Sequence, residues 1–253
     1  MDAPFHSARY SIAHAKRRIA EFESEEIAFI KSNPYTRAME QNTDGTEDFY
    51  KIKLTKPMPV GLPGIGFDVV SNLRTALDQA GYDVAVAAGT TGKKAHFPFG
   101  LDLTEVQSRA NEASKHIPKD IFNYMVSCEP YKTGNYLLWA LNQLCNSHKH
   151  EILTPVAMSI AGASTGRNFF EGPVISVKIP PVWDREKNEM ILAHVKHGTA
   201  VQINLQLNVF IALAKVDVVD GAPALRVFND LASIVERIIF GIEAEARRIK
   251  LIR

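Results

Sequence analysis

Several features that mark well-defined classes of protein are scarce or missing in this sequence. Only two cysteines occur among its 253 residues, Cys128 and Cys145. Neither has metal-ligand spacing, and both lie in an apolar context typical of a helix. We therefore do not expect a fold held by disulfides or by a cysteine-bound metal. We expect a reducing, cytoplasmic location.

The sequence also lacks an excess of positive or negative charge, and it has no long apolar run. The 29 basic and 28 acidic side chains leave a formal net charge of +1. No global basic field points to nucleic acid, so RNA binding would need a local patch of cations. No stretch of about 18 consecutive apolar residues occurs, and residues 1–26 mix charged and apolar residues unlike a signal peptide. The sequence therefore predicts no association with a membrane.

The motifs of nucleotide and metal sites are missing as well. The glycines of residues 61–66 (GLPGIG) do not match G-x-G-x-x-G, and no Walker lysine follows them. His148 and His150 diverge on a helix, whereas His194 and His197 could converge. No carboxylate or cysteine at ligand spacing joins either pair. No G-x-S-x-G nucleophile turn is present. We predict neither a metal ion nor a cofactor.

The first half of the chain has the apolar periodicity of helices. Thr104 and Gln107 have the spacing of a capping box, which predicts a helix start at this point. Pro118 is expected to divide the region that follows, because proline breaks the helical hydrogen-bond ladder. Helices are expected over residues 6–32, 66–88, from Thr104 to Pro118, beyond Pro118, and from Tyr136 to about Glu151.

Short segments rich in β-branched residues follow. The clearest covers residues 200–210, where apolar residues alternate with Gln and Asn, so that one face must be buried and the other wet. After Pro223 a broad apolar stripe predicts a last helix that runs nearly to Arg253. Strands are expected within residues 49–54, 152–163, 173–180, 189–195 and 200–219.

Together these patterns predict an α+β fold. We expect a helical N-terminal half of about four to five helices, packed with an antiparallel sheet of four to five strands and a long C-terminal helix. No linker or repeat divides the chain. The prediction is one composite domain over residues 1–253, with a helical part of about 1–151 and a sheet with its closing helix over about 152–253.

A polar stripe interrupts the helix that begins at Tyr136. Asn142, Asn146, Lys149 and His150 lie at i, i+4, i+7 and i+8, and therefore on one helical face. Amide, ammonium and imidazole groups can bind an anion or a sugar-phosphate, and His150 could act as a general base. The alternative is a polar network that ties the helix to the sheet, with His150 stabilised by the helix macrodipole.

A second polar cluster lies within residues 72–78 (NLRTALD). Arg74 and Asp78 are i, i+4 neighbours beside Asn72. The pair could contact a phosphate or take part in catalysis, or it could be an ion pair that orients the helix. Because this helix and the one from Tyr136 are the most apolar in the chain, they should pack together and bring the two clusters close.

Four motifs resemble, as a set, a large group of uncharacterised bacterial and phage proteins. They are NLRTALD, HFPFG, CEPY and LWALNQLCNSHKHEIL. The recurring pattern of that group is roughly N-L-R-x-A-L-D-H, F-P-I, L-x-P-Y and L-x-x-L-x-N-x-x-K-H-R. An N-terminal helix followed by an N-P-Y corner also fits. The resemblance covers about residues 6–153.

A looser resemblance is to HEPN-type helical domains, many of which are metal-independent ribonucleases of toxin and defence systems. Their signature is an arginine followed four to six residues later by a histidine on a helical face. Gln79 stands at the histidine position after Arg74, and Glu151 stands where an arginine often follows K-H. If the chain is such a ribonuclease, we expect His150 as the catalytic base, because it shares a helical face with Asn142 and Asn146. Arg74 would then stabilise the charged transition state.

Three functions fit these patterns. The first is a cytoplasmic protein that binds RNA or a nucleotide in a polar pocket between two core helices. The second is an HEPN-like ribonuclease that uses His150 and Arg74. The third is a non-enzymatic structural or assembly protein, and the apolar stripes of the first and last helices could serve a homodimer. The ligand-binding residues expected for the first function are Asn72, Asp78, Asn142, Asn146 and Lys149.

Overall fold

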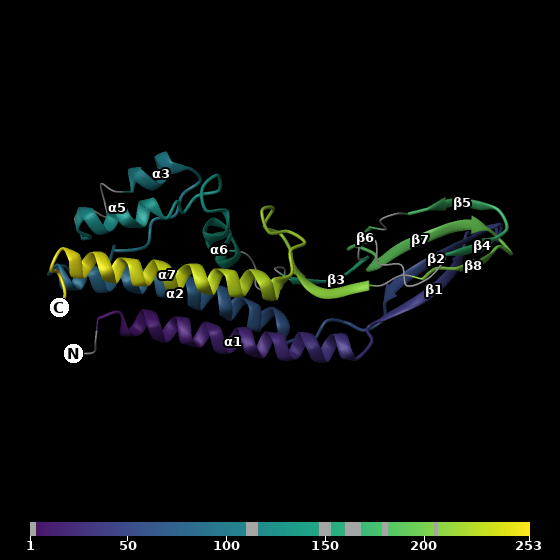
Figure 1. Ribbon diagram of the computed structural model, residues 1–253, viewed down its shortest axis with the longest axis horizontal. Helices are drawn as coiled ribbons and strands as arrows, with labels where there is room; N and C mark the ends of the chain where they lie inside the picture. Colours follow the sequence, from purple (N-terminus) through teal and green to yellow (C-terminus); the bar gives the residue numbers. More distant parts are fainter. Residues whose placement is uncertain (1–3, 110–115, 147–152, 160–167, 179–181, 205–206) are drawn as a thin grey trace. The chain divides into compact units, whose positions relative to one another are not determined.

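The computed structural model describes residues 4–109, 116–146, 153–159, 168–178, 182–204 and 207–253. Over these residues the chain is α+β, with a helical first half, an antiparallel sheet and a long C-terminal helix, as the sequence predicts (Figure 1). It divides into two compact units. Whether these units act as the single composite domain expected above stays a prediction. The helical unit comprises Met1–Glu23, Val60–Leu153 and Leu213–Arg253, and the sheet unit comprises Ser24–Pro59 and Thr154–Ala212.

Three long helices run side by side in the helical unit (Figure 1). They are α1 (His6–Lys31, of which the part up to Glu23 belongs here), α2 (Leu62–Ala87) and α7 (Ala224–Arg248). Apolar side chains of α2 and α7 meet in the core, and Phe22 of α1 contacts Phe228 of α7 edge-on, with ring centroids 5.2 Å apart. At the surface, Lys16 of α1 pairs with Glu236 of α7 at 2.7 Å.

The start of α2 differs from the prediction for a physical reason. The helix was expected from residue 66, after a segment (residues 56–66) that carries three prolines and three glycines. The helix nevertheless begins at Leu62, and Pro63 lies in its first turn. Proline is tolerated there because the first backbone N–H groups of a helix have no partner within the helix.

Three shorter helices complete the described part of the helical unit. They are α3 (Leu103–Ser108), α5 (Lys119–Ser127) and α6 (Tyr136–Asn146), and α6 packs against α2 and α7. The capping box of α3 is not Thr104 with Gln107. Asp102 caps the helix by accepting the Glu105 N–H at 2.8 Å, and the Glu105 side chain accepts the Leu101 N–H at 2.7 Å. The N-cap therefore lies two residues before Thr104, and the Glu105 side chain bonds the residue that precedes the cap.

The main sheet of the sheet unit has the strand order β1-β2-β7-β5, with β6 also paired to β7. The strands expected from the sequence do not include β1, whose polar, partly exposed residues form an edge strand against β2. The expected strand over residues 200–219 is divided, because β8 pairs with β4 and β9 with β3. The bounds are β1 Tyr35–Gln41, β2 Glu47–Leu54, β3 Leu153–Ser159, β4 Phe169–Glu171, β5 Val174–Val177, β6 Trp183–Asp184, β7 Glu189–Lys196, β8 Ala200–Gln202 and β9 Leu207–Leu213.

The two faces of this sheet differ in chemistry. One face carries an apolar core cluster to which Ile52, Met190 and Leu192 belong. The other carries ion pairs, among them Lys51 with Glu40 at 2.7 Å. Hydrogen bonds from Lys51 and Lys53 hold the pKa of Glu40 at about 2.

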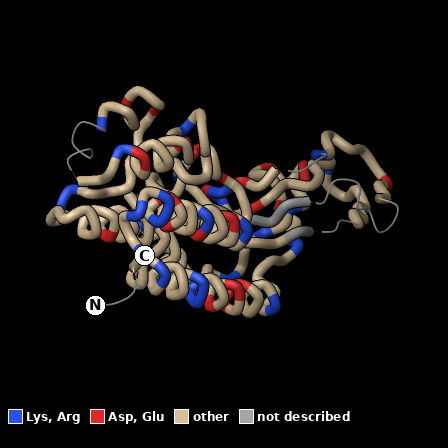
Figure 2. Tube along the Cα trace, turned by 60° about the vertical axis from the view of Figure 1, so that its left-hand side comes forward, with Lys and Arg blue, Asp and Glu red and all other residues tan. Residues whose placement is uncertain are grey.

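Charges of both signs are interspersed along the helices, as Figure 2 shows. This agrees with the near-zero net charge of the sequence. A cationic binding surface must therefore be a local arrangement of a few side chains.

Among the described residues, no helix is both long and apolar enough to cross a membrane.

Candidate functional site

The two polar clusters predicted from the sequence meet where α2 packs on α6. The Arg74 Nε donates a hydrogen bond to Asn142 Oδ1 at 3.2 Å. The neighbouring pair Cys145 and Ser71 also spans the two helices, with Sγ and Oγ 3.9 Å apart. The polar edges of α2 and α6 therefore meet at these contacts, and we call this place the α2–α6 edge.

Arg74 is held on three sides at this edge. Its guanidinium lies over the ring of Phe99, with the central carbon 4.3 Å from the ring centroid. Its Nη1 lies 2.5 Å from Asp78 Oδ1 but out of line for a hydrogen bond, so this contact is an ion pair. About a fifth of the side chain is exposed (19%). Among the described residues, no partner is found for Nη2.

Asp78 joins α2 to the HFPFG segment. Its Oδ1 accepts the backbone N–H of Phe97 at 3.0 Å and lies 3.7 Å from Nδ1 of His96, whose side chain is 66% exposed. The segment can come this close because residue 81 is glycine: a Cβ there would lie 2.4 Å from the carbonyl oxygen of Ala95. His96 is therefore an accessible imidazole beside the Arg74–Asp78 pair.

An exposed aromatic and two exposed lysines extend this surface, and the sequence patterns did not indicate them. Tyr82 lies one turn beyond Asp78 on α2 and is 48% exposed. Gly92 packs directly against its ring, so residues 92–96 follow α2 from Tyr82 towards Asp78. Lys93 and Lys94 of this segment are exposed. The α2–α6 edge thus continues into a small cationic surface with an aromatic ring.

The other predicted site residues have mixed placements. Asn72 donates its amide to the backbone oxygen of Asp68 at 2.7 Å, one turn earlier in α2, and has no described contact with Arg74. Asn146 is the exposed last residue of α6. Lys149 and His150 lie outside the described residues, so their roles stay predictions.

The position that corresponds to the HEPN histidine has a packing role in this chain. The Ser11 hydroxyl of α1 donates to the Gln79 side-chain oxygen at 2.9 Å, which joins α1 to α2. Gln79 is therefore engaged with another helix.

The histidines of the HVKH segment bind different carboxylates. His194 lies 2.7 Å from Glu47 and stacks on the ring of Phe49, whereas His197 lies 3.2 Å from Asp48. No group of three or more His, Cys, Asp or Glu in the described part of the chain is arranged to hold a metal ion.

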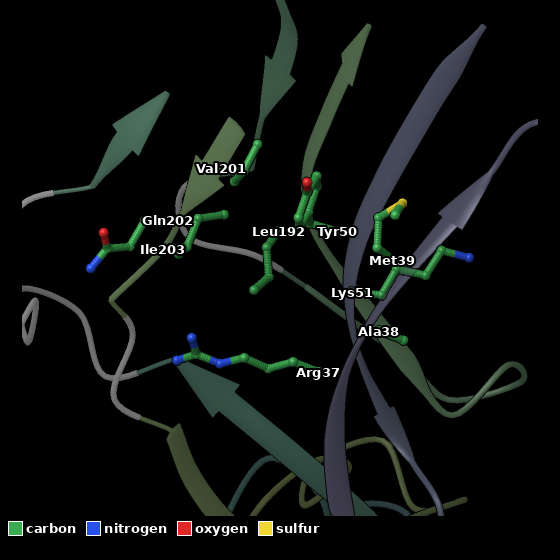
Figure 3. A pocket seen from close by; sticks show the side chains of 9 residues that line it. All are labelled: Arg37, Ala38, Met39, Tyr50, Lys51, Leu192, Val201, Gln202 and Ile203. Atoms are coloured by element: carbon green, nitrogen blue, oxygen red, sulfur yellow. The ribbon is translucent and has the colours of Figure 1, made fainter. Parts of the chain in front are cut away.

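A pocket on the sheet unit is a second candidate site (Figure 3). Its volume is about 300 Å³. Strands far apart in the sequence contribute to it, which is why no local pattern indicated it. The lining residues are Arg37, Ala38, Met39, Tyr50, Lys51, Leu192, Val201, Gln202 and Ile203.

Comparison of the chain with protein-family models, with curated proteins and with solved structures finds no match. The two resemblances suggested by the motifs therefore stay expectations. Functional proposals for this chain rest on the geometry of the α2–α6 edge and of the sheet pocket.

Proposed function

We propose that the protein binds single-stranded RNA or a nucleotide at the α2–α6 edge, with Arg74 as the phosphate-binding group. The observation that carries the proposal is the hydrogen bond from Arg74 to Asn142, which joins the two polar clusters. A guanidinium fixed by a hydrogen bond and an aromatic ring loses little conformational freedom when it binds a phosphate. Its Nη2, for which no partner is found among the described residues, is the donor available to such a ligand.

The charge balance of the edge favours a few phosphate contacts. Asp78 offsets the charge of Arg74, so this pair is neutral as a unit. The surplus positive charge comes from Lys93 and Lys94, which are exposed on the segment packed against α2. Two or three cations suit a nucleotide or a short single strand, whereas a duplex-binding surface neutralises many more phosphates.

The exposed ring of Tyr82 favours a single-stranded ligand. Its ring is half exposed and lies directly against Gly92. Unpaired bases stack on aromatic rings at roughly 1–3 kcal/mol per base, whatever the sequence. A strand whose phosphates contact Lys93 and Lys94 would have a base within reach of Tyr82.

The other two predicted functions have less support. The ribonuclease would require His150, which lies outside the described residues, and Gln79 is engaged with Ser11. The structural alternative assigns the Arg74 network to helix packing alone. It predicts that RNA and nucleotides do not bind, so a binding measurement separates it from the present proposal.

Fluorescence anisotropy with a labelled single-stranded RNA of mixed sequence, over a series of salt concentrations, tests the proposal. Lys93→Gln combined with Lys94→Gln should weaken binding and reduce the slope of log affinity against log salt by about 0.7 for each lysine that binds a phosphate. Tyr82→Ala should weaken binding without changing that slope. Matched controls are Lys187→Gln and Tyr10→Ala, which change exposed residues that have no described contact with the edge.

Two outcomes would overturn the proposal. One is the absence of binding to the RNA and to mononucleotides at low salt, which would favour the structural alternative. The other is binding that the edge variants and the control variants weaken equally. Thermal unfolding of each variant shows whether a loss of affinity reflects a loss of fold.

A further inference from the structure

The sheet pocket has an unbalanced positive charge. Arg37 is exposed on the edge strand β1, and no acidic side chain among the described residues pairs with it. None of the described aspartates and glutamates lines the pocket. In Figure 3 the Arg37 side chain extends from β1 towards the side formed by Gln202 and Ile203. An anionic group in the pocket would therefore meet a cation that no described carboxylate neutralises.

Lys51 does not supply a second charge. Its ammonium binds Glu40 at 2.7 Å and Glu189 at 2.9 Å, and Figure 3 shows its side chain directed away from Leu192. The strand register explains this direction. Lys51 is directly opposite Ala38, whereas Arg37 is opposite Ile52, and directly opposite residues share a face of the sheet. The pocket therefore opens on the face of Arg37 and the apolar core.

The walls of the pocket are largely apolar. Leu192 belongs to the core cluster of the sheet unit, and Ile203 packs against that cluster. Val201 is half-buried, and Met39 is 52% exposed at the edge. A flexible methionine beside fixed aliphatic groups can adapt to the shape of a ligand. The apolar surface next to Arg37 favours a ligand with a hydrophobic body.

Two uncharged polar groups can orient such a ligand. Among the described residues, the Tyr50 hydroxyl has one long contact, 3.5 Å, with the backbone oxygen of Thr199, and a ligand oxygen placed closer would be a better acceptor. Gln202 is exposed and brings an amide. A few polar groups in an apolar concavity are typical of small-molecule sites, although about 300 Å³ is at the small end of their range.

From these features we propose that the sheet pocket binds a small organic anion, separately from the RNA site of the helical unit. Its carboxylate or phosphate pairs with Arg37, and its apolar or aromatic body covers Leu192, Val201 and Ile203. A cationic ligand is disfavoured because it would meet Arg37 without an acidic partner. A nucleic-acid strand is disfavoured because one unbalanced cation gives little counter-ion release.

The test is an NMR titration of the whole chain with phenylacetate, phenyl phosphate and neutral phenylacetamide. We expect one or both anions to shift the amide signals of β1, Leu192 and Val201, and phenylacetamide to bind at least tenfold more weakly. Arg37→Gln should weaken the anions roughly tenfold to a hundredfold, as expected for one hydrogen-bonded charge. Arg226→Gln, an arginine whose side chain is 81% exposed in the helical unit, is the matched control and should have no effect.

Three results would overturn the proposal. The first is that neither anion shifts these signals at millimolar concentrations. The second is equal binding of phenylacetamide and phenylacetate. The third is that inorganic phosphate binds as tightly as phenyl phosphate, because the apolar wall would then contribute nothing. Arg37 is exposed on an edge strand, so its variant should unfold at the same temperature as the wild type, which separates loss of binding from loss of fold.

Discussion

The side chain of Arg74 donates a hydrogen bond to the side-chain oxygen of Asn142, with the two atoms 3.2 Å apart. This bond connects two residues 68 positions apart and aligns the polar edges of two otherwise apolar helices. Because Arg74 also lies over Phe99 and beside Asp78, it is expected to contribute to packing as well as to recognition.

Arg74→Ala should cost more stability than Lys250→Ala. Removing the guanidinium takes the hydrogen-bond donor from Asn142 Oδ1 and the neighbouring cation from Asp78, at roughly 1–3 kcal/mol. Lys250 is exposed near the C-terminus, where most substitutions stay within about 0.5 kcal/mol. Urea denaturation measures both variants. Equal midpoints would count against a network role for Arg74.

Gly81→Ala should destabilise the helical unit by roughly 1–3 kcal/mol, because the new Cβ would collide with the backbone at Ala95. The matched control is Gly64→Ala in the same helix, where a Cβ meets no atom within 4 Å. That change should stabilise by about 0.5–1 kcal/mol, since alanine is the better helix former. Calorimetry measures the unfolding temperature of each variant. A shift in the same direction for both variants would contradict the close approach of Gly81 to Ala95.

Glu243 should make stability depend on pH. Burial alone raises the pKa of this carboxyl, but the hydrogen bond from Arg247 and the charge of Arg9 outweigh it, so the pKa lies below the ordinary 4.5. A lowered folded-state pKa gives stability that is present above the unfolded value and lost as the pH falls through the folded value. Glu243→Gln should cost roughly 1–3 kcal/mol at neutral pH and progressively less below about pH 5. The measurement is the denaturation midpoint of the wild type and of Glu243→Gln at each pH. A difference between the two proteins that is the same at neutral and acidic pH would contradict this prediction.

We expect no metal-independent cleavage of RNA by the purified protein in chelator. The HEPN signature has a histidine shortly after the arginine, and the corresponding residue after Arg74 is Gln79, which is bonded to Ser11. Gel analysis of structured and single-stranded RNA, with His150→Ala as the comparison, tests this. Cleavage by the wild type that disappears in His150→Ala would contradict the expectation and support the ribonuclease.

The packing of α2 on α6 could be predicted because both helices are strongly apolar with a narrow polar stripe. The link between Arg74 and Asn142 follows from that packing. By contrast, the accessibility of Tyr82 and His96 could not be predicted, because it depends on how residues 92–99 lie on α2. The position of this segment depends on the close approach of Ala95 to Gly81. That approach is a tertiary contact, and no local sequence pattern indicates it.

The sheet was harder to predict. Residues 35–41 (YTRAMEQ) are too polar to suggest a strand, and they form one because β2 offers an open edge. The alternation over residues 200–210 predicted one strand, but β8 and β9 have different partners. The sheet pocket brings Arg37 and Ile203 together from distant parts of the chain, which sequence periodicity cannot report.

The most direct test of the central claim follows the side-chain NMR signals of Arg74 and Asn142 as single-stranded RNA is added to the ¹⁵N-labelled protein. If RNA phosphate binds at the α2–α6 edge, the Arg74 Nε–H signal and the Asn142 amide signals should shift with the same saturation curve, together with the backbone amides of residues 92–96. Signals that stay fixed at the edge while RNA binds, or that shift only elsewhere in the chain, would contradict the account.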